Sequence, residues 1–325
     1  MSQSPLHRLS IVIPVYQGEE TLPTLIQEIE PLTTEKQTRS GHSFRVTEVV
    51  LVHDCGPDHS DKVLEELSKK YPFVRPVWLS KNYGQHPATL AGMASSTGDF
   101  VVTMDEDGQQ NPSDIALMLD TAIAESAQLV YAEPKNPPPH GFFRNLLSSS
   151  AKKLASLLLS NPEVMYFNSF RLVDGETARS LAAYCGSGVF LDVALFWITA
   201  HTAHCKVTLR PEMGRPSGYS LGKLFKHFWQ LLLTSGTKPL RLITLMGFGS
   251  VFLAVLITIY TLWVKFHLEV PVQGWASIVI VVAFFSGCIL TALGIIAEYL
   301  AVTMTIVMGK PLYAVSTKPV RFLKP

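Results

Sequence analysis

Short apolar runs alternate with amphipathic stretches through the first 132 residues of the chain. The apolar runs are rich in β-branched residues, which is typical of buried parallel strands, and the stretches between them carry apolar residues at the spacing of a helix face. We predict strands at residues 9–15, 47–53, 76–79, 100–104 and 128–132, and helices at 19–30, 61–71, 87–95 and 111–124. This alternation indicates an α/β fold with a doubly wound, mainly parallel sheet.

The pattern changes in the last third of the chain. Residues 219–238 place an apolar, aromatic face opposite a basic one, which is typical of a helix in the membrane interface, although an ordinary docking helix gives a similar pattern. Two uncharged runs follow at 242–264 and 275–297, and each forms a helix of about 34 Å, long enough to cross a bilayer. The predicted domains are a soluble domain at 1–218, the interface helix at 219–238, a transmembrane hairpin at 239–309 and a tail at 310–325.

The charges around the two apolar runs predict their orientation. Several lysines and arginines lie before the first run and after the second, whereas the connection between the runs holds one lysine. The positive-inside rule therefore places both termini and the soluble domain in the cytoplasm, and the N-terminus does not resemble a signal peptide. Only 16% of the residues are charged, against roughly 25% in soluble domains. We expect a multi-pass protein of the plasma (inner) membrane.

Two features of the predicted hairpin point to further contacts. Small residues, Gly247 and Gly249 in one run and Gly287 and Gly294 in the other, would allow the spans to pack into a homo-oligomer. Glu298 is predicted at the cytoplasmic edge of the second span, where a structural ion pair is favoured over a functional role.

The net charge and the cysteines exclude some classes of function. A net charge of +1 gives no indication of a nucleic-acid partner, because binding to the phosphate backbone relies on an excess of positive charge. The four cysteines are scattered without paired spacing, so they suggest neither a zinc site nor a disulfide framework.

An acidic segment, FVVTMDEDGQQNP at residues 100–112, follows a predicted buried strand. Asp105 and Asp107 project to the same side of an extended segment, with Gln109 two residues further on. Their oxygens could therefore converge on Mg²⁺ or Mn²⁺, which would offset the cost of holding several carboxylates together. Acidic residues after a strand also cap helices or face solvent, and the segment alone does not decide between these interpretations.

Other polar residues support a site at the same edge of the sheet. Tyr16, Asp54 and Asp105 all fall at strand ends, and ligands of doubly wound sheets bind beyond the carboxyl ends of the strands. Arg144 and Arg171 stand in a part of the chain that is poor in charge, and arginine suits phosphate recognition through its planar fork of donors. The alternative for such cations is a solvated helix face, which is less suitable for Arg171 because its neighbours are apolar.

An ordered set of segments gives a more specific indication. The segments are SIVIPVYQGEETL, VVLVHDCGPDHS, SKNYGQHPATLAGMASSTGDFVVTMDEDGQQNP, FRLV, PSGYSLGKL, GIIAEYLAV and GKPLYAV. In this order they resemble the family 2 glycosyltransferases that act on polyprenyl phosphates, a group that includes dolichyl-phosphate mannose synthases and undecaprenyl-phosphate transferases. The resemblance covers nearly the whole chain, and the two predicted spans match the bacterial branch.

The resemblance implies a GT-A fold and the inverting, metal-dependent transfer of a sugar (EC 2.4) from a nucleotide-diphosphate sugar to a polyprenyl phosphate such as undecaprenyl phosphate, giving a lipid-linked monosaccharide. It favours UDP-glucose as the donor over GDP-mannose, with Mg²⁺ or Mn²⁺ as the cofactor. Carried over by position, the implied donor-binding residues are Pro14, Tyr16, Glu19 and Asp54, and the implied metal ligands are Asp105, Asp107 and Gln109. The implied acceptor-phosphate residues are Arg144, Ser169 and Arg171, and Ser217 belongs to the segment that leads into the interface helix.

The chain departs from the family pattern in three places. His53 and Cys55 stand in a motif that usually has two adjacent aspartates followed by Gly-Ser. Gln17 and Gly18 replace the usual Asn-Glu, which leaves Glu19 or its neighbour as a substitute. Glu106 replaces a small residue between the two aspartates, and we predict that it points away from the metal as a bystander.

Two other functions are compatible with these residues. A polysaccharide-extending glycosyltransferase would share the acidic segment, but such enzymes usually carry a Gln-x-x-Arg-Trp motif and more spans, and neither is found in this sequence. A catalytically impaired membrane protein that binds a sugar nucleotide would explain His53 and Gly18, whereas the complete acidic segment and Arg171 argue against it.

Overall fold

The computed structural model describes residues 5–136, 162–186, 190–210 and 274–319, together with residues 243, 247–250, 252–253, 255–260 and 263. Arg144, Ser217, the predicted interface helix and part of the first predicted span lie outside the described residues.

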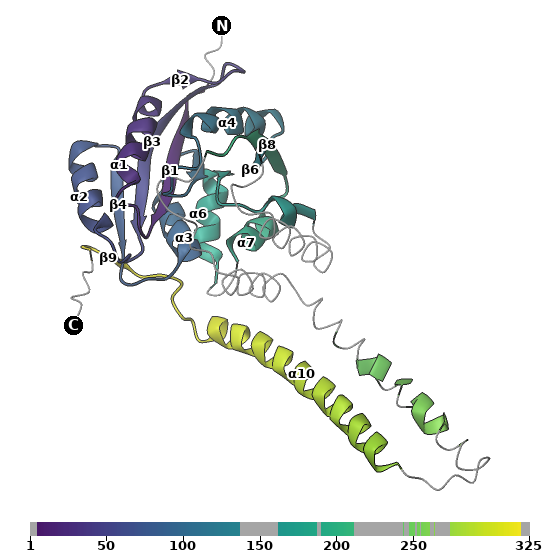
Figure 1. Ribbon diagram of the computed structural model, residues 1–325. Coiled ribbons are helices and arrows are strands. Elements are labelled where there is room, and N and C mark those ends of the chain that lie inside the picture. Colours follow the sequence, from purple (N-terminus) through teal and green to yellow (C-terminus); the bar gives the residue numbers. More distant parts are fainter. Residues whose placement is uncertain are drawn as a thin grey trace.

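Nine strands of the described residues form one sheet in the order β8-β6-β7-β5-β1-β3-β4-β9, with β2 paired to β3 (Figure 1). The strands are β1 (His7–Val15), β2 (Lys36–Gln37), β3 (Ser43–His53), β4 (Val74–Leu79), β5 (Phe100–Thr103), β6 (Leu129–Pro134), β7 (Arg171–Asp174), β8 (Thr202–Val207) and β9 (Val315–Ser316). The helices are α1 (Leu22–Ile29), α2 (Ser60–Lys70), α3 (Gln85–Ser95), α4 (Ile115–Ala124), α6 (Gly175–Tyr184), α7 (Leu191–Ile198) and α10 (Trp275–Val307). Among the described residues, 3₁₀ turns lie at Glu30–Thr33, Pro112–Asp114 and Pro162–Tyr166.

The sheet is mixed, with a parallel centre. β1 pairs in parallel with β3 and with β5. β3 pairs in parallel with β4, and β6 pairs in parallel with β8. The predicted strands and helices of the first 134 residues are confirmed to within a few residues at each end. The structure adds β7, which runs antiparallel between β5 and β6, the edge strand β8, and the short strands β2 and β9.

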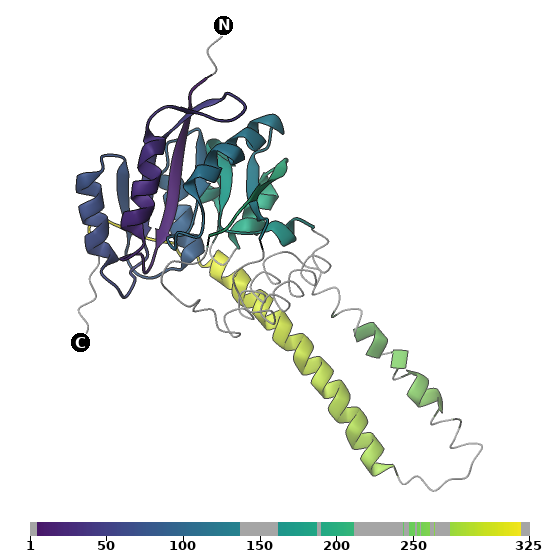
Figure 2. The same cartoon turned by 45° about the horizontal axis from the view of Figure 1, so that its top comes forward.

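Helices cover both faces of the sheet (Figures 1 and 2). Alternate residues of β1 point to opposite faces, so Ile11 and Ile13 pack with α1, α2 and α4, whereas Val12 packs with α3, α6 and α7. All three side chains are fully buried. The apolar run that predicted a strand buried on both sides therefore forms the centre of the sheet.

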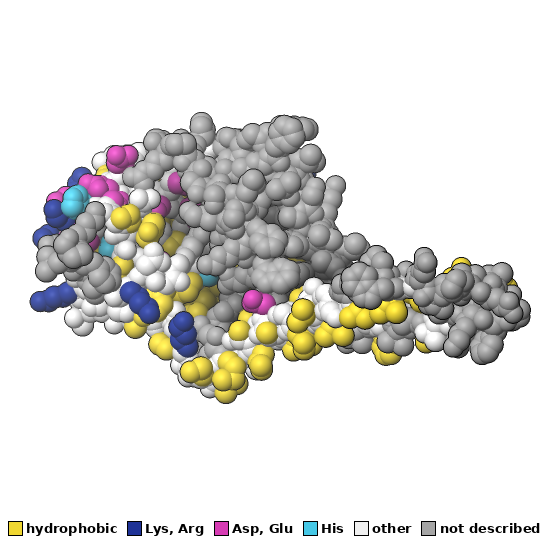
Figure 3. Space-filling view, turned by 60° about the horizontal axis from the view of Figure 1, so that its bottom comes forward, with side chains coloured by type: hydrophobic (Ala, Val, Ile, Leu, Met, Phe, Trp, Pro, Cys, Tyr) yellow, Lys and Arg dark blue, Asp and Glu magenta, His cyan; other side chains and the backbone are white. Residues whose placement is uncertain are grey.

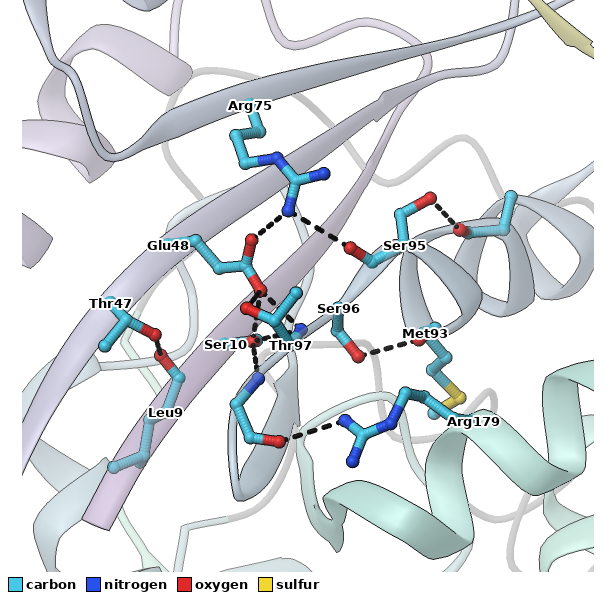
Figure 4. Close-up of polar contacts among 12 residues, drawn as sticks. Leu9, Ser10, Thr47, Glu48, Arg75, Met93, Ser95, Ser96, Thr97 and Arg179 are labelled. Carbon is cyan, nitrogen blue, oxygen red and sulfur yellow. Dashed lines mark hydrogen bonds and ion pairs between the residues drawn. The ribbon is translucent and has the colours of Figure 1, made fainter.

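A buried carboxylate ties the sheet together in its N-terminal half (Figure 4). Glu48 on β3 accepts hydrogen bonds from Ser10 Oγ at 2.7 Å and from Thr97 N at 2.6 Å, and it forms an ion pair with Arg75 on β4. Arg75 also donates to the carbonyl of Ser95 at 3.2 Å. These contacts join β1, β3, β4 and the end of α3 at a distance from the carboxyl ends of the strands.

The helix α10 leads away from the α/β domain (Figures 1 and 2). Its 33 residues extend over about 50 Å, ten residues beyond the predicted end at 297. The stretch Phe284–Met304 has the length and composition of a membrane span, and none of it is buried in the protein. Figure 3 shows its hydrophobic side chains, in yellow, along the exposed side of the helix. Glu298 therefore lies exposed inside this stretch rather than at its edge.

Within the described part of the chain, α10 is the one helix that is long and apolar enough to cross a membrane. A shorter apolar helix, Gly247–Tyr260, falls within the first predicted span. The structure thus shows one long apolar helix where the sequence predicted two spans, and the first predicted span is described only in part.

After α10 the chain returns to the α/β domain. β9 pairs antiparallel with the end of β4, and Ser80 N donates to the carbonyl of Ala314 at 2.9 Å. Leu312 and Tyr313 pack against the core on the α3 side of the sheet. The predicted tail therefore begins as part of the folded domain and connects the apolar helix to an edge of the sheet.

Candidate active site

The loops that follow β1, β3 and β5 meet at the carboxyl ends of these strands. Asp54 N donates to the carbonyl of Val15 at 2.8 Å, and Tyr16 N donates to Glu106 at 3.0 Å. Gln85, at the start of α3, reaches Asp105 with its side chain. The prediction that Tyr16, Asp54 and Asp105 share one edge of the sheet is confirmed.

Asp105 is held in place by three side chains. Its Oδ1 accepts a hydrogen bond from Gln85 Nε2 at 2.7 Å, and its Oδ2 accepts from Gln110 Nε2 at 3.0 Å and from the Ser169 hydroxyl. Burial and the neighbouring charge of Asp107 raise the pKa of Asp105 to about 6, although the hydrogen bond from Ser169 opposes the shift. The groups around Asp105 therefore do not fully offset the cost of burying its negative charge.

Asp107 and Gln109 form the turn beyond Asp105. Gln109 N donates to Asp107 Oδ1 at 3.0 Å, and Gly108 between them has a φ of +72°, a conformation that glycine adopts without strain. Burial raises the pKa of Asp107. Two carboxylates and an amide oxygen match the ligands that Mg²⁺ and Mn²⁺ prefer, so the residues fit such an ion. Among the described residues no group of three or more His, Cys, Asp or Glu side chains converges, and a metal would need further ligands from waters or phosphate oxygens.

Glu106 makes contacts that the sequence did not predict. Its two carboxylate oxygens accept hydrogen bonds from the backbone N–H groups of Tyr16 and Gln17, both at 3.0 Å. Burial raises its pKa to about 7 in spite of these bonds. Glu106 and Asp107 lie in a turn rather than in the extended segment that we predicted. The description of Glu106 as a bystander was wrong, because it fixes the loop that follows β1.

Asp54 braces the turn before α3. Its oxygens accept hydrogen bonds from Tyr83 N at 2.7 Å and Gly84 N at 2.8 Å, and the side chain is buried. Burial raises the pKa of Asp54 against the effect of these bonds. The structure thus gives Asp54 a role in loop geometry, and its contact with a nucleoside stays a prediction.

His53, the residue before Asp54, is buried against Trp78 with ring centroids 5.5 Å apart. Neither of its ring nitrogens has a hydrogen-bond partner within the described ranges of the chain, and burial lowers its pKa. A neutral imidazole therefore packs at the end of β3, where the family pattern usually places an aspartate.

Arg171 lies in the interior rather than on an open surface. It occupies the first position of β7, is 3% exposed, and forms a buried ion pair with Asp192 of α7. Tyr131 also donates a hydrogen bond to Asp192, at 2.9 Å. The guanidinium is therefore engaged by a carboxylate in this structure, although the resemblance implied a contact with the acceptor phosphate.

The sequence of residues 10–186 matches the model of the family described as "Glycosyl transferase family 2", which is more than half of the chain. The chain belongs to this family. It is a glycosyltransferase of class EC 2.4.

Curated relatives resemble the glycosyltransferase over nearly its whole length. An undecaprenyl-phosphate 4-deoxy-4-formamido-L-arabinose transferase of Pseudomonas aeruginosa is 27% identical over 316 residues, covering 96% of this chain and 90% of the relative. A bactoprenol glucosyl transferase of Shigella phage SfX is 23% identical over 315 residues, covering 96% of this chain and 99% of the relative.

A solved structure shows the same fold. Glucosyl-3-phosphoglycerate synthase from Mycobacterium tuberculosis, in complex with Mn²⁺, UDP-glucose and phosphoglyceric acid, matches with a TM-score of 0.51 at 18% identity. The match covers 71% of this chain and 79% of that protein. The α/β domain of the glycosyltransferase therefore has the GT-A fold.

The remaining predicted residues of the glycosyltransferase fall into different environments. Pro14 is buried within β1, whereas Tyr16 is 42% exposed beyond the strand end. Glu19 accepts a hydrogen bond from His59 N at 3.0 Å and so joins two loops. Ser169 contacts Asp105, which places a predicted acceptor residue beside a predicted metal ligand.

Arg210 was missed from the sequence. Its backbone N–H donates to the carbonyl of Gln109 at 2.9 Å, and its side chain bonds to Asn111 at 2.8 Å and to Glu28 at 2.7 Å. The residue thus supports the end of the acidic segment from the chain that follows β8. An isolated arginine after a strand gives no such indication in the sequence, because its partners lie about 100 and 180 residues away.

Proposed function

We propose that this glycosyltransferase transfers a sugar, with inversion, from a nucleotide-diphosphate sugar to undecaprenyl phosphate and so forms a lipid-linked monosaccharide. The observation that carries the proposal is the acidic segment at the carboxyl ends of β1, β3 and β5, in a chain that also carries the exposed apolar helix α10. The two curated relatives, whose names state that they act on undecaprenyl phosphate and on bactoprenol, support the choice of acceptor.

For the donor and the metal, we infer that Asp107 and Gln109, with Asp105, hold Mg²⁺ or Mn²⁺. Both oxygens of Asp105 already accept hydrogen bonds, which favours Asp107 as the direct ligand. When bound, the metal would neutralise the diphosphate leaving group. UDP-glucose is the favoured donor, with GDP-mannose as the alternative, and the structural relative bound to Mn²⁺ and UDP-glucose supports this order.

The proposed reaction does not need a strong general base, because a lipid phosphate is ionised near neutral pH. The residues must instead bring two anions together and offset their repulsion. Arg144 remains the proposed direct contact to the acceptor phosphate. Arg171 would have to leave Asp192 to reach a phosphate, so we assign it an electrostatic influence on Asp105, whose pKa its charge lowers.

The membrane supplies the acceptor in this proposal. A polyprenyl lipid stays in the bilayer, and an enzyme with its α/β domain in the cytoplasm needs an anchor that holds the site near the phosphate. The composition of α10 and its contiguity with β9 support such an arrangement in the inner membrane. The second span and the cytoplasmic position of both termini remain part of the proposal.

The test is a donor screen with full-length protein in membranes that contain undecaprenyl phosphate. We expect a lipid-linked monosaccharide with UDP-glucose or, failing that, with GDP-mannose. Asp107→Asn should abolish this transfer without changing the thermal unfolding temperature by more than a few degrees, and retained turnover would refute the metal assignment. A polymeric product would favour the polysaccharide-extending alternative, and donor binding without any transfer would favour an impaired sugar-nucleotide-binding protein.

A further inference from the structure

The loop between β1 and α1 is held by oxygens from other segments. Glu106 takes the first two backbone N–H groups of this loop, from Tyr16 and Gln17, with one carboxylate oxygen each at 3.0 Å. The next two N–H groups, of Gly18 and Glu19, donate to Ser60 at 2.9 Å and to Asp58 at 3.1 Å. Two N–H groups of the loop share the two oxygens of one carboxyl group, and these hydrogen bonds are strongest when Glu106 is ionised, so Glu106 fixes the position of this loop.

Gly18 makes room for Glu106. A Cβ atom at position 18 would lie 2.7 Å from Glu106 Oε2 and 2.7 Å from Leu22 Cδ1, closer than such atoms approach one another. The φ of Gly18 is not in the left-handed range, so the glycine is required for space rather than for its backbone conformation. Glu106 and Gly18 are therefore complementary, although both depart from the family pattern.

The position of Glu106 in the chain gives these contacts a consequence for the site. Its neighbours Asp105 and Asp107 carry the proposed metal site, and its side chain holds Tyr16, which is exposed at the proposed donor pocket. A shift of Glu106 would therefore change the distance between the proposed metal ligands and Tyr16 at the proposed donor pocket.

We propose that Glu106 is a positioning residue for the sugar-nucleotide donor, which fixes the loop at Tyr16–Gly18 against the acidic segment and depends on the absence of a side chain at Gly18. This inference rests on the proposed function for the identity of the donor. The hydrogen bonds that it invokes are tested separately from catalysis.

The first experiment uses Glu106→Gln in the full-length protein in membranes. Glutamine keeps one acceptor oxygen but turns an NH₂ group toward the other backbone N–H, so one hydrogen bond is lost and two donors face each other. We expect the KM for UDP-glucose to rise about tenfold or more, as for the loss of one hydrogen bond to a charged group, with less than a twofold change in the KM for undecaprenyl phosphate. In hydrogen exchange, the amides of Tyr16 and Gln17 should exchange at least tenfold faster.

The matched control is Glu48→Gln. Glu48 is also a buried glutamate that accepts a hydrogen bond from a backbone N–H, that of Thr97. It lies at a distance from the carboxyl ends of the strands, where the proposed donor pocket is. We expect this variant to lower the unfolding temperature and to leave the donor KM unchanged. If Glu106→Gln keeps the wild-type donor KM, or if its loss matches that of Glu48→Gln in every readout, Glu106 is only a structural residue and the proposal is overturned.

A second pair of variants tests the complementarity with Gly18. Gly18→Ala should displace the carboxylate and raise the donor KM, whereas the same change in a Glu106→Ala background should cost at least threefold less, because the clash with Oε2 is gone and only that with Leu22 remains. Additive effects would contradict the coupling. If the wild-type protein transfers no sugar, the proposed function fails, and equilibrium binding of UDP with Mn²⁺ together with the exchange of the Tyr16 and Gln17 amides still decides the role of Glu106.

Discussion

The buried ion pair between Arg171 and Asp192 allows a quantitative test of the structure. Both side chains are 4% exposed, and Arg171 Nε has no hydrogen-bond partner in the described segments. In Asp192→Asn the amide keeps the shape of the side chain but cannot neutralise the guanidinium. Removing one partner of a buried pair costs about 3–5 kcal/mol of unfolding free energy, because the remaining charge is left without compensation.

This loss should lower the Tm of the α/β domain in the full-length protein by roughly 6–20 °C, given that 1 kcal/mol corresponds to about 2–4 °C for a domain of about 150–250 residues. The control is Asp99→Asn, which removes the exposed pair of Asp99 with Arg8, whose side chains are 40% and 53% exposed. Thermal unfolding followed by circular dichroism in detergent measures both variants. A fall in Asp192→Asn no larger than that in Asp99→Asn would refute the burial argument, because water would then have to reach Arg171.

Three further predictions concern stability. Burial raises the pKa of Glu48, but its hydrogen bonds, led by that from Ser10, outweigh burial and lower the folded-state pKa below the ordinary value of 4.5. The contribution of Glu48 to stability should therefore be full above pH 4.5 and should fade as the pH falls through the folded-state pKa. The Tm difference between wild type and Glu48→Gln should shrink over that range, and a constant difference would contradict this prediction. Gly84 has φ +94° and ψ 167°, a region that only glycine adopts readily, and the space around its Cβ position is open. Gly84→Ala should therefore lower the free energy of unfolding by about 1–3 kcal/mol through backbone strain alone. Denaturant unfolding measures this loss, and an unchanged midpoint would contradict the prediction. Ser316→Pro removes the backbone N–H that faces Trp78 of β4 in the antiparallel pair, and should release the tail to proteolysis, whereas Lys318→Ala, beyond the strand, should not.

Most of the α/β framework was predictable because its strands carry their own signal. The run at 9–15 is apolar and β-branched on both faces, and its neighbours in the sheet do not change that pattern. β7 and β9 gave no comparable signal, since they contain four and two residues, and their pairing depends on segments 40 or more residues away. The direction of β7, antiparallel beside β5, is a property of the connection and not of its residues.

In the candidate site, too, some features could be predicted from the local sequence and others depend on distant segments. The strand before the acidic segment was predictable, but the chain turns at Glu106 and Asp107, so the alternation of side chains in an extended segment does not apply there. The contacts of Glu106 depend on the pairing of β5 with β1, which brings the loop at Tyr16 beside the acidic segment. The role of Arg171 was interpreted from its apolar neighbours and from the family resemblance. The relevant signal was Asp192, an acidic residue in the otherwise apolar helix LDVALFWI, because a lone charge in such a helix requires a partner.

The return of the chain to the sheet after α10 connects the apolar helix to the site through few residues. β9 pairs with the last two residues of β4, and the chain that leaves β4 forms the turn at Tyr83 and Gly84 that Asp54 holds. The next residue, Gln85, donates to Asp105. The contacts from the tail to Asp105 thus run through one strand end and one turn. Because the tail follows α10 directly, these contacts form a continuous path in the fold from the apolar helix to the acidic segment.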